Sequence, residues 1–370
     1  MSKKEGMTYA GTGVNYDEMD PFKIAAQLAA GKTASNIERF GFSELVSSRG
    51  ESAYIVEMIN FYMAFVEEGL GTKNLVADAM YTLTGKTYYD QIAQCTIAMI
   101  VNDLITVGAL PVSVAMHLAV GDSAWFSDTK RTDDLIAGWK KGCDLARCTW
   151  GGGETPTLKG VVVPEAVVLS GSSVGMIRSD REMLSGEKIQ DGDVIVIIES
   201  SGIHANGLTL ARKIADKLPE GYLTKMPSGR AYGEALLDPT IIYVPLVDEC
   251  QKEGIELHYG INITGHGLRK LMRAQQKFSY VVDKIPQVPE VLTFMQMHGP
   301  VSDEEAYGNL NMGAGFALIV PPKSSAKVIT KANNLEMKAF AGGRVHKSDE
   351  RSVHIKPKNL VYSESSLKVR

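Results

Sequence analysis

Apolar and polar positions alternate with helix-like and strand-like periods along the whole chain. In the first half, the pattern predicts helices over residues 21–30, 91–107 and 132–146, and strands over residues 54–66, 111–120 and 161–177. In the second half it predicts strands over residues 194–198 and 316–320, and helices over residues 208–217, 268–274 and 289–298. Helices and strands that alternate in this way are typical of the α/β class.

A charged stretch at residues 178–191 separates the two halves. The chain has 370 residues, which is enough for two domains of ordinary size. We therefore predict an N-terminal domain over residues 1–177 and a C-terminal domain over residues 178–370. The first 50 residues, rich in Gly and Ser, are predicted to form a partly irregular arm around one helix.

Composition and charge exclude several classes of protein. Hydrophobic residues make up 44% of the chain and charged residues 22%, as in ordinary globular proteins. The formal net charge of −4 argues against nucleic-acid binding by bulk electrostatics. There is no apolar run long enough for a transmembrane helix, no signal-peptide core and no Cys-x-x-Cys pair among the four cysteines. We expect a cytoplasmic protein with no membrane partner.

Two familiar phosphate-binding motifs are incomplete in this sequence. Gly85-Lys86-Thr87 ends like a P-loop, but the position that requires the first glycine is Met80. No complete G-x-G-x-x-G occurs either, because Gly69 and Gly71 are followed by Asn74. These patterns give a P-loop or a dinucleotide-binding fold little support.

Three clusters carry acids beside glycines or within an apolar helix. In residues 67–73, two glutamates precede a Gly-x-Gly turn that ends in Lys73, so the acids suit Mg²⁺ and the lysine suits phosphate. The alternative is a surface hairpin. Asn102 and Asp103 interrupt an apolar helix, where they either join a metal or phosphate network or form an internal hydrogen-bonded pair. Residues 151–155 read as a glycine loop that presents Glu154, or as a plain connector.

Two further clusters lie at the ends of predicted strands or the starts of predicted helices. Residues 200–207 follow the apolar strand over residues 194–198, and the end of such a strand is a favoured ligand position. Residues 262–267 precede a predicted helix, whose free N–H groups would suit an anion. Simple N-capping by Thr264 is the alternative there.

Taken in order, these clusters resemble the aminoimidazole ribonucleotide (AIR) synthetase family. The matching motifs cover residues 68–73, 101–104, 152–155, 200–207, 236–240 and 264–267, with further likeness at residues 9–14 and 311–315. The resemblance implies a two-domain α/β fold with the active site in the cleft between the domains. It also implies a homodimer whose N-terminal strands form a barrel-like core, and ATP use without a P-loop.

The resemblance implies a reaction and a set of site residues. Formylglycinamidine ribonucleotide and ATP would give AIR, ADP and phosphate, with Mg²⁺ neutralising charge. The metal would be held by Glu68, Asp103 and Glu154. The nucleotide would also meet Gly69, Gly71, Thr72, Lys73, Asn102, Gly152 and Gly153. Lys73, His204 and Asn206 would be catalytic, and Thr264, Gly265 and Gly267 would hold the phosphate of the ribonucleotide substrate.

Three positions depart from the family pattern. Glu68 replaces an Asp, Cys95 replaces a second Asp, and His266 replaces the middle glycine of Thr-Gly-Gly-Gly. A thiol is a poor ligand for Mg²⁺, and His266 either obstructs the phosphate, donates to it or points to the surface. Two alternative functions therefore stay open: a related ATP-dependent small-molecule phosphotransferase, and a non-catalytic nucleotide-binding dimer.

Overall fold

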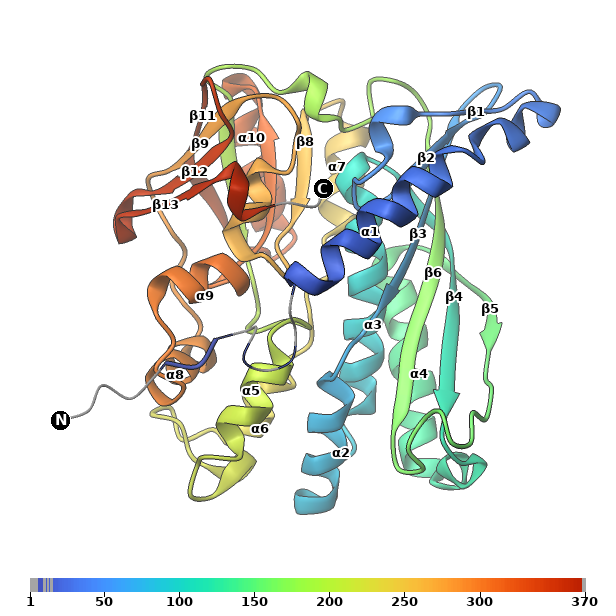
Figure 1. Cartoon of the computed structure of the whole chain (residues 1–370), viewed down its shortest axis with the longest axis vertical. Helices are drawn as coiled ribbons and strands as arrows, with labels where there is room; N and C mark the ends of the chain where they lie inside the picture. Colours follow the sequence, from blue (N-terminus) through green and yellow to red (C-terminus); the bar gives the residue numbers. More distant parts are fainter. Residues whose placement is uncertain (1–5, 9–10, 12, 14–15, 368–370) are drawn as a thin grey trace.

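The computed structural model describes residues 6–8, 11, 13 and 16–367, which form two sheets covered by helices (Figure 1). The mixed α/β class is confirmed. All strands of one sheet lie before residue 178 and all strands of the other lie after residue 193. Of the segment at residues 9–14, only Gly11 and Gly13 are among the described residues.

The first sheet has six strands in the order β1-β2-β3-β6-β4-β5. Their bounds are β1 Ser43–Glu44, β2 Tyr54–Glu57, β3 Tyr62–Gly69, β4 Leu110–Val120, β5 Thr149–Glu154 and β6 Val167–Ile177. Neighbouring strands are antiparallel except β4 and β5, which run parallel at one edge.

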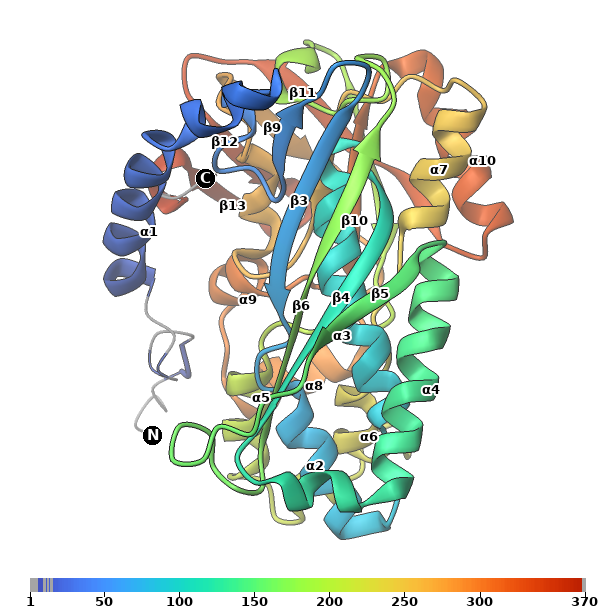
Figure 2. The same ribbon diagram turned by 90° about the vertical axis from the view of Figure 1, so that its right-hand side faces the viewer.

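Among the described residues, helices cover one face of this sheet and leave the other face open. The helices are α2 Lys73–Thr84, α3 Tyr89–Leu104 and α4 Thr129–Ala146. On β6, buried positions such as Leu169 face the helices, while Val168 and Met176 alternate with them and are exposed. Figure 2 views the sheet from this second, open face, with α3 behind it.

The second sheet has seven strands in the order β13-β12-β9-β11-β7-β10-β8. Their bounds are β7 Val194–Glu199, β8 Tyr259–Asn262, β9 Phe278–Val282, β10 Ala314–Val320, β11 Ala339–Lys347, β12 Ser352–Ile355 and β13 Leu360–Ser363. Every residue of β10 is buried, as expected for a central strand with both faces covered.

In the described residues, six α-helices belong to the half of the chain that contains the second sheet. One more α-helix precedes the strands of the first sheet. They are α5 Leu208–Ala215, α6 Tyr232–Leu236, α7 Val244–Lys252, α8 Glu290–His298, α9 Asp303–Asn309, α10 Pro322–Asn334 and, near the N-terminus, α1 Tyr16–Gly31. In Figure 1, α3 lies between the two sheets and α1 crosses the line where the halves meet. Within the described ranges, no helix is long and apolar enough to span a membrane.

Three predicted elements differ from the structure. The strand predicted over residues 54–66 is two strands, β2 and β3, because a tight turn closes between the Met58 N–H and the Phe61 carbonyl. The strand predicted over residues 161–177 begins only at Val167, and Val161 before it is 81% exposed. The α-helix predicted over residues 268–274 is a short 3-10 helix, η8 Gly267–Met272.

Candidate active site

A cleft of about 610 Å³ opens where α1, β3 and α3 meet the loop after β8. Its lining comes from both halves of the chain and includes five residues predicted from the sequence: Glu68, Asp103, Asn206, Thr264 and Gly265. These positions are up to 197 residues apart in sequence (265 − 68), so the agreement is a property of the fold and not of local spacing.

Two carboxyl groups form the acidic side of the cleft. Glu68 lies near the end of β3 and Asp103 near the end of α3, and the two carboxyls are within hydrogen-bonding contact. Burial, and next the negative charge of Asp103, raise the pKa of Glu68 to about 8. Asp103 also accepts a 2.7 Å hydrogen bond from the side-chain amide of Asn262 on β8. A buried acid pair of this kind favours a cation between or beside its oxygens.

Basic side chains line the cleft as well. Lys23 from α1, Lys270 from η8 and Arg273 just after η8 line it. The guanidinium of Arg273 donates to the Gly50 carbonyl and to the Ser52 hydroxyl, which fixes it against the first half. The cleft therefore has a place for a cation and a place for an anion, as a site for a metal–phosphate complex requires.

The loop after β7 sends Asn206 into the cleft but turns His204 away from it. Asn206 lines the cleft beside Met99 of α3. His204 is buried, with a positive φ of 61°, and its Nε2 accepts the Ser201 N–H at 3.2 Å. Burial, and next the charge of Lys73, lower the pKa of His204 to about 3. A neutral, internally bonded imidazole is suited to holding the loop in shape.

This buried histidine predicts acid sensitivity. When the pKa of a histidine is lower in the folded state than in the unfolded chain, where it is near 6.5, the free energy of unfolding decreases as the pH falls below 6.5. This decrease continues down to the folded-state pKa of about 3. We expect His204→Gln, which keeps an acceptor, to reduce the stability lost between pH 7 and pH 5 by about 2 kcal/mol. Urea unfolding at both pH values measures this, with exposed His346→Gln as the control. An unchanged pH dependence in His204→Gln would contradict it.

Lys73 and Asn102 fasten the two halves together rather than lining the cleft. The Lys73 ammonium is fully buried and donates to the carbonyls of His204 and Asp238, each at 2.7 Å. The Asn102 amide donates to the Ile241 carbonyl and accepts the Tyr243 N–H. Asn102 is therefore held by internal hydrogen bonds, which it makes with the backbone of residues 241 and 243.

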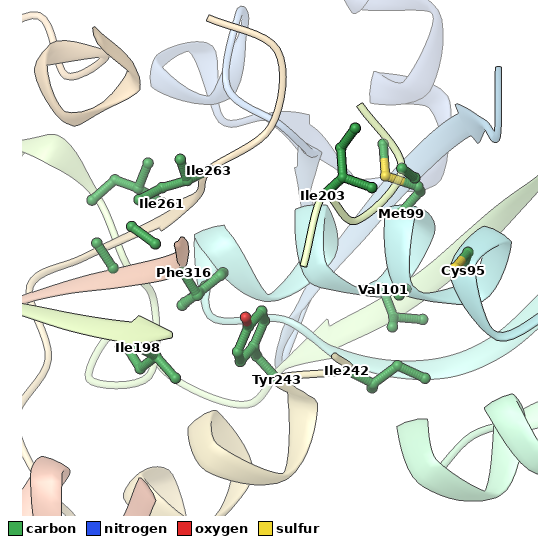
Figure 3. Close-up of a cluster of buried hydrophobic side chains, with 14 of the residues drawn as sticks. Cys95, Met99, Val101, Ile198, Ile203, Ile242, Tyr243, Ile261, Ile263 and Phe316 are labelled. Carbon is green, nitrogen blue, oxygen red and sulfur yellow. The ribbon is translucent and has the colours of Figure 1, made fainter. Parts of the chain in front are cut away.

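Cys95 belongs to the same interface between the two halves. Its sulfur accepts the Thr240 N–H at 3.3 Å, and the thiol lies in the apolar cluster of Figure 3 with Met99, Ile242 and Tyr243. Side chains from α2 and α3 thus bond to successive backbone groups of residues 238–243. Cys95, which replaces an Asp of the family pattern, therefore lies in this packed interface.

Glu154 lies apart from the acid pair. The register pairs Glu68 with Gly171, Gly171 with Met116 and Met116 with Gly153, so β5 is three strands, about 14 Å, from β3. Glu154 is exposed, and the pleat directs it to the opposite face of the sheet from Glu68. In the described part of the chain, no three His, Cys, Asp or Glu side chains gather as a metal site.

Glycines in two of the predicted acidic motifs are explained by the local backbone structure. Residues 149–154 form the edge strand β5 and not a loop, and a Cβ at Gly153 would lie 2.1 Å from the Met116 carbonyl oxygen. Gly152 adopts a φ of 132°. Residues 67–73 are the end of β3 with Gly69 as its last residue, a turn at Gly71 and Thr72, and the start of α2, which excludes the surface hairpin.

The loop after β8 approaches the cleft as predicted, but without an α-helix behind it. Thr264, Gly265 and His266 line the cleft, and Gly267 is buried where a Cβ would meet the Tyr307 carbonyl at 2.4 Å. Thr264 makes no side-chain cap; its hydroxyl accepts from Lys270 instead. Burial, and next the charge of Arg269, lower the pKa of His266 to about 3. His266 is therefore a neutral wall of the cleft, and the surface-pointing alternative is wrong.

A larger hollow of about 760 Å³ lies elsewhere, against the start of α10. Its lining includes Lys188, His258 and Lys323, and none of the site residues predicted from the sequence. We assign the site to the smaller cleft because acid and base residues from both halves converge there.

Sequence reasoning missed the basic side of the cleft. Lys270, Arg273 and Lys23 belong to no motif singled out above. The only signal was the run of basic residues that follows the glycine loop, at Arg269, Lys270 and Arg273.

Comparison with known proteins identifies the family. The profile of the AIR synthase related protein N-terminal domain matches residues 50–177, and that of the C-terminal domain matches residues 190–356. The chain belongs to the AIR synthase-related family. A phosphoribosylformylglycinamidine cyclo-ligase of Methanococcus maripaludis is 32% identical over 349 residues, 93% of each chain. A protein of the same name from Methanocaldococcus jannaschii is 35% identical over 78% of this chain and 80% of its own.

Solved structures share the fold of this chain at low sequence identity. A complex of HypE with HypF aligns with a TM-score of 0.59 and 14% identity, covering 85% of this chain and 92% of the other. A thiamine monophosphate kinase from Aquifex aeolicus aligns with a TM-score of 0.55 and 16% identity, covering 82% and 91%. At these identities the likeness supports the fold alone.

Proposed function

We propose that this chain converts formylglycinamidine ribonucleotide and ATP into AIR, ADP and phosphate, as a step of purine biosynthesis. The observation that carries the proposal is the 32% identity to a cyclo-ligase over 93% of both chains. The cleft supports it, because residues from both halves supply an acid pair, a basic side and a glycine loop. We also propose that the boundary between the two domains lies between residues 177 and 178. The four cysteines of the chain are free thiols, which suits the reducing cytoplasm.

The chemistry requires one phosphoryl transfer and one ring closure. The formyl oxygen is a poor leaving group, so the terminal phosphoryl group of ATP is transferred to it, which releases ADP. A nitrogen of the same substrate then attacks that carbon, and phosphate leaves with the former formyl oxygen. The protein chiefly has to orient the two substrates and offset negative charge.

The acid pair fits Mg²⁺. Glu68 and Asp103 offer hard oxygen ligands, and Mg²⁺ in phosphoryl-transfer sites commonly takes one or two carboxylates together with substrate phosphates. Bound there, Mg²⁺ would neutralise charge on phosphate oxygens. Two carboxylates suffice for this, so Glu154 is not needed within one chain.

The remaining cleft residues position the ribonucleotide and ATP. Thr264 and Gly265 offer a hydroxyl and backbone N–H groups to phosphate oxygens, and Asn206 offers both a donor and an acceptor to substrate polar groups. Lys73 and His204, bonded inside the protein, hold the loop that carries Asn206.

A homodimer would cover the open face of the first sheet. Phe65 on β3 is 46% exposed there, and Met176 and Val168 on β6 are exposed on the same face of the sheet. Clusters of exposed apolar side chains on one face mark interaction surfaces. Glu154, also on this face, would reach a nucleotide only in such a dimer.

Phe65→Glu is expected to weaken the dimer by about a hundredfold or more, because it buries a carboxylate near its symmetry mate. Light scattering after size-exclusion chromatography measures the mass, with Leu83→Glu, at an exposed position on α2, as the control. A Phe65→Glu protein with the mass of the wild type would contradict the proposed interface.

The decisive assay incubates purified protein with formylglycinamidine ribonucleotide, ATP and Mg²⁺. AIR and ADP in equal amounts are expected. A stable phosphorylated acceptor would favour the phosphotransferase, and nucleotide binding with no turnover would favour the non-catalytic dimer. Either result would overturn the proposed cyclisation.

A further inference from the structure

Lys270 is held at the wall of the cleft by two neutral oxygens. Its ammonium donates to the Thr264 hydroxyl at 2.5 Å and to the Asn262 carbonyl at 3.1 Å. An ammonium has three N–H donors, and these two bonds use two of them. Since Lys270 lines the cleft, the third donor is available to a ligand oxygen.

One of these two residues, Asn262, links Lys270 to the acid pair through a second hydrogen bond. Asn262 accepts Lys270 on its carbonyl and donates from its side chain to Asp103 at 2.7 Å. The charges of Asp103 and Glu68 both act on the ammonium, yet its bonds go to Thr264 and Asn262. The carboxylates are therefore left open to a divalent cation, with a fixed positive charge beside them.

Such a charge has opposite effects on a bare metal ion and on a metal–phosphate complex. A fixed ammonium near two carboxylates repels a divalent cation that binds them. The same ammonium attracts a phosphate oxygen and forms a charge-assisted hydrogen bond with it. A residue that only supported the fold would weaken both kinds of binding together.

We propose that Lys270 is the lysine of this site that contacts phosphate, and that it stands beside the divalent-cation pair of Glu68 and Asp103. It weakens binding of the bare metal and strengthens binding of metal with phosphate. This role, which rests on the proposed function, is the one that the sequence motif suggested for Lys73. The ammonium of Lys73 instead donates hydrogen bonds to two backbone carbonyls.

The test is Lys270→Gln, with two measurements of opposite expected sign. Mn²⁺ alone, titrated by electron paramagnetic resonance, should bind about tenfold more tightly to the variant. In the presence of Mg²⁺, calorimetry with β,γ-methylene ATP or with ribose 5-phosphate should show affinity lowered by about tenfold or more for one of them. The ligand that weakens identifies whether the phosphate belongs to the nucleotide or to the ribonucleotide.

Lys23→Gln is the matched control, since it removes a positive charge from the same cleft where the ammonium contacts Asp20. It should change Mn²⁺ affinity by less than about twofold. Lys270→Arg keeps the charge and should retain the Mn²⁺ affinity of the wild type, and Lys270→Met is a second neutral variant if the glutamine protein does not fold. Unchanged or weaker Mn²⁺ binding in the neutral variants, or unaltered affinity for both phosphates, would overturn the proposal. None of these readouts needs AIR formation, so they fail independently of the proposed reaction.

Discussion

Asp103→Asn is expected to lower kcat/KM for AIR formation by about 10³-fold, which corresponds to about 4 kcal/mol of transition-state stabilisation. Asp103 is 5% exposed, lines the cleft and contacts the carboxyl of Glu68. Asparagine keeps an oxygen to accept the bond from Asn262 but removes the charge that would hold Mg²⁺. Steady-state kinetics with varied Mg²⁺ measures the effect.

The folded state of this variant should be intact. Removing one of two neighbouring carboxylates relieves their repulsion, so the urea midpoint should stay equal or rise. Asp144→Asn, on the exposed side of α4 beside Lys140, is the control and should keep full activity. Turnover within tenfold of the wild type in Asp103→Asn, at saturating ATP, would exclude Asp103 from the metal site.

Lys73→Met is expected to destabilise the protein by about 3–5 kcal/mol. The ammonium is 0% exposed, and its loss leaves the carbonyl oxygens of His204 and Asp238 buried without their donor. Because these bonds join α2 to the second half, the loss should appear as a lower urea midpoint for the whole chain. Lys140→Met, at an exposed position, should change the stability by less than about 0.5 kcal/mol.

The same variant separates two roles for Lys73. If the lysine is a fastener, affinity for β,γ-methylene ATP, measured on folded protein at low temperature, should stay within about threefold of the wild type. If it contacts phosphate, affinity should fall by tenfold or more with little loss of stability. The second result would show that Lys73 contacts phosphate, and it would contradict the role of Lys73 in holding the two halves together.

The sequence predicted much of the fold because its signals are local. The apolar spacing in α3 and the alternation in β6 follow directly from the geometry of helix and strand. The turn that splits β2 from β3 was missed because Ile59 and Phe61 are apolar although exposed, which hides the break.

The site was predicted in part, and the reason differs from residue to residue. Glu68, Asp103, Asn206, Thr264 and Gly265 do converge on one cleft. Lys270 could not be predicted, because a single lysine on a short 3-10 helix has no pattern of its own and its meaning depends on β3 and α3 lying opposite.

By itself, the sequence determined the family, the α/β class and the order of the chemical motifs, because these are properties of residue type and spacing. Only the tertiary structure decided which way each motif residue faces. Lys73 and Asn102 stand in motifs beside Glu68 and Asp103, yet they turn into the interface between the halves. A helix or strand presents successive residues in different directions, so neighbours in one motif fasten the fold or line the cleft according to what packs against them.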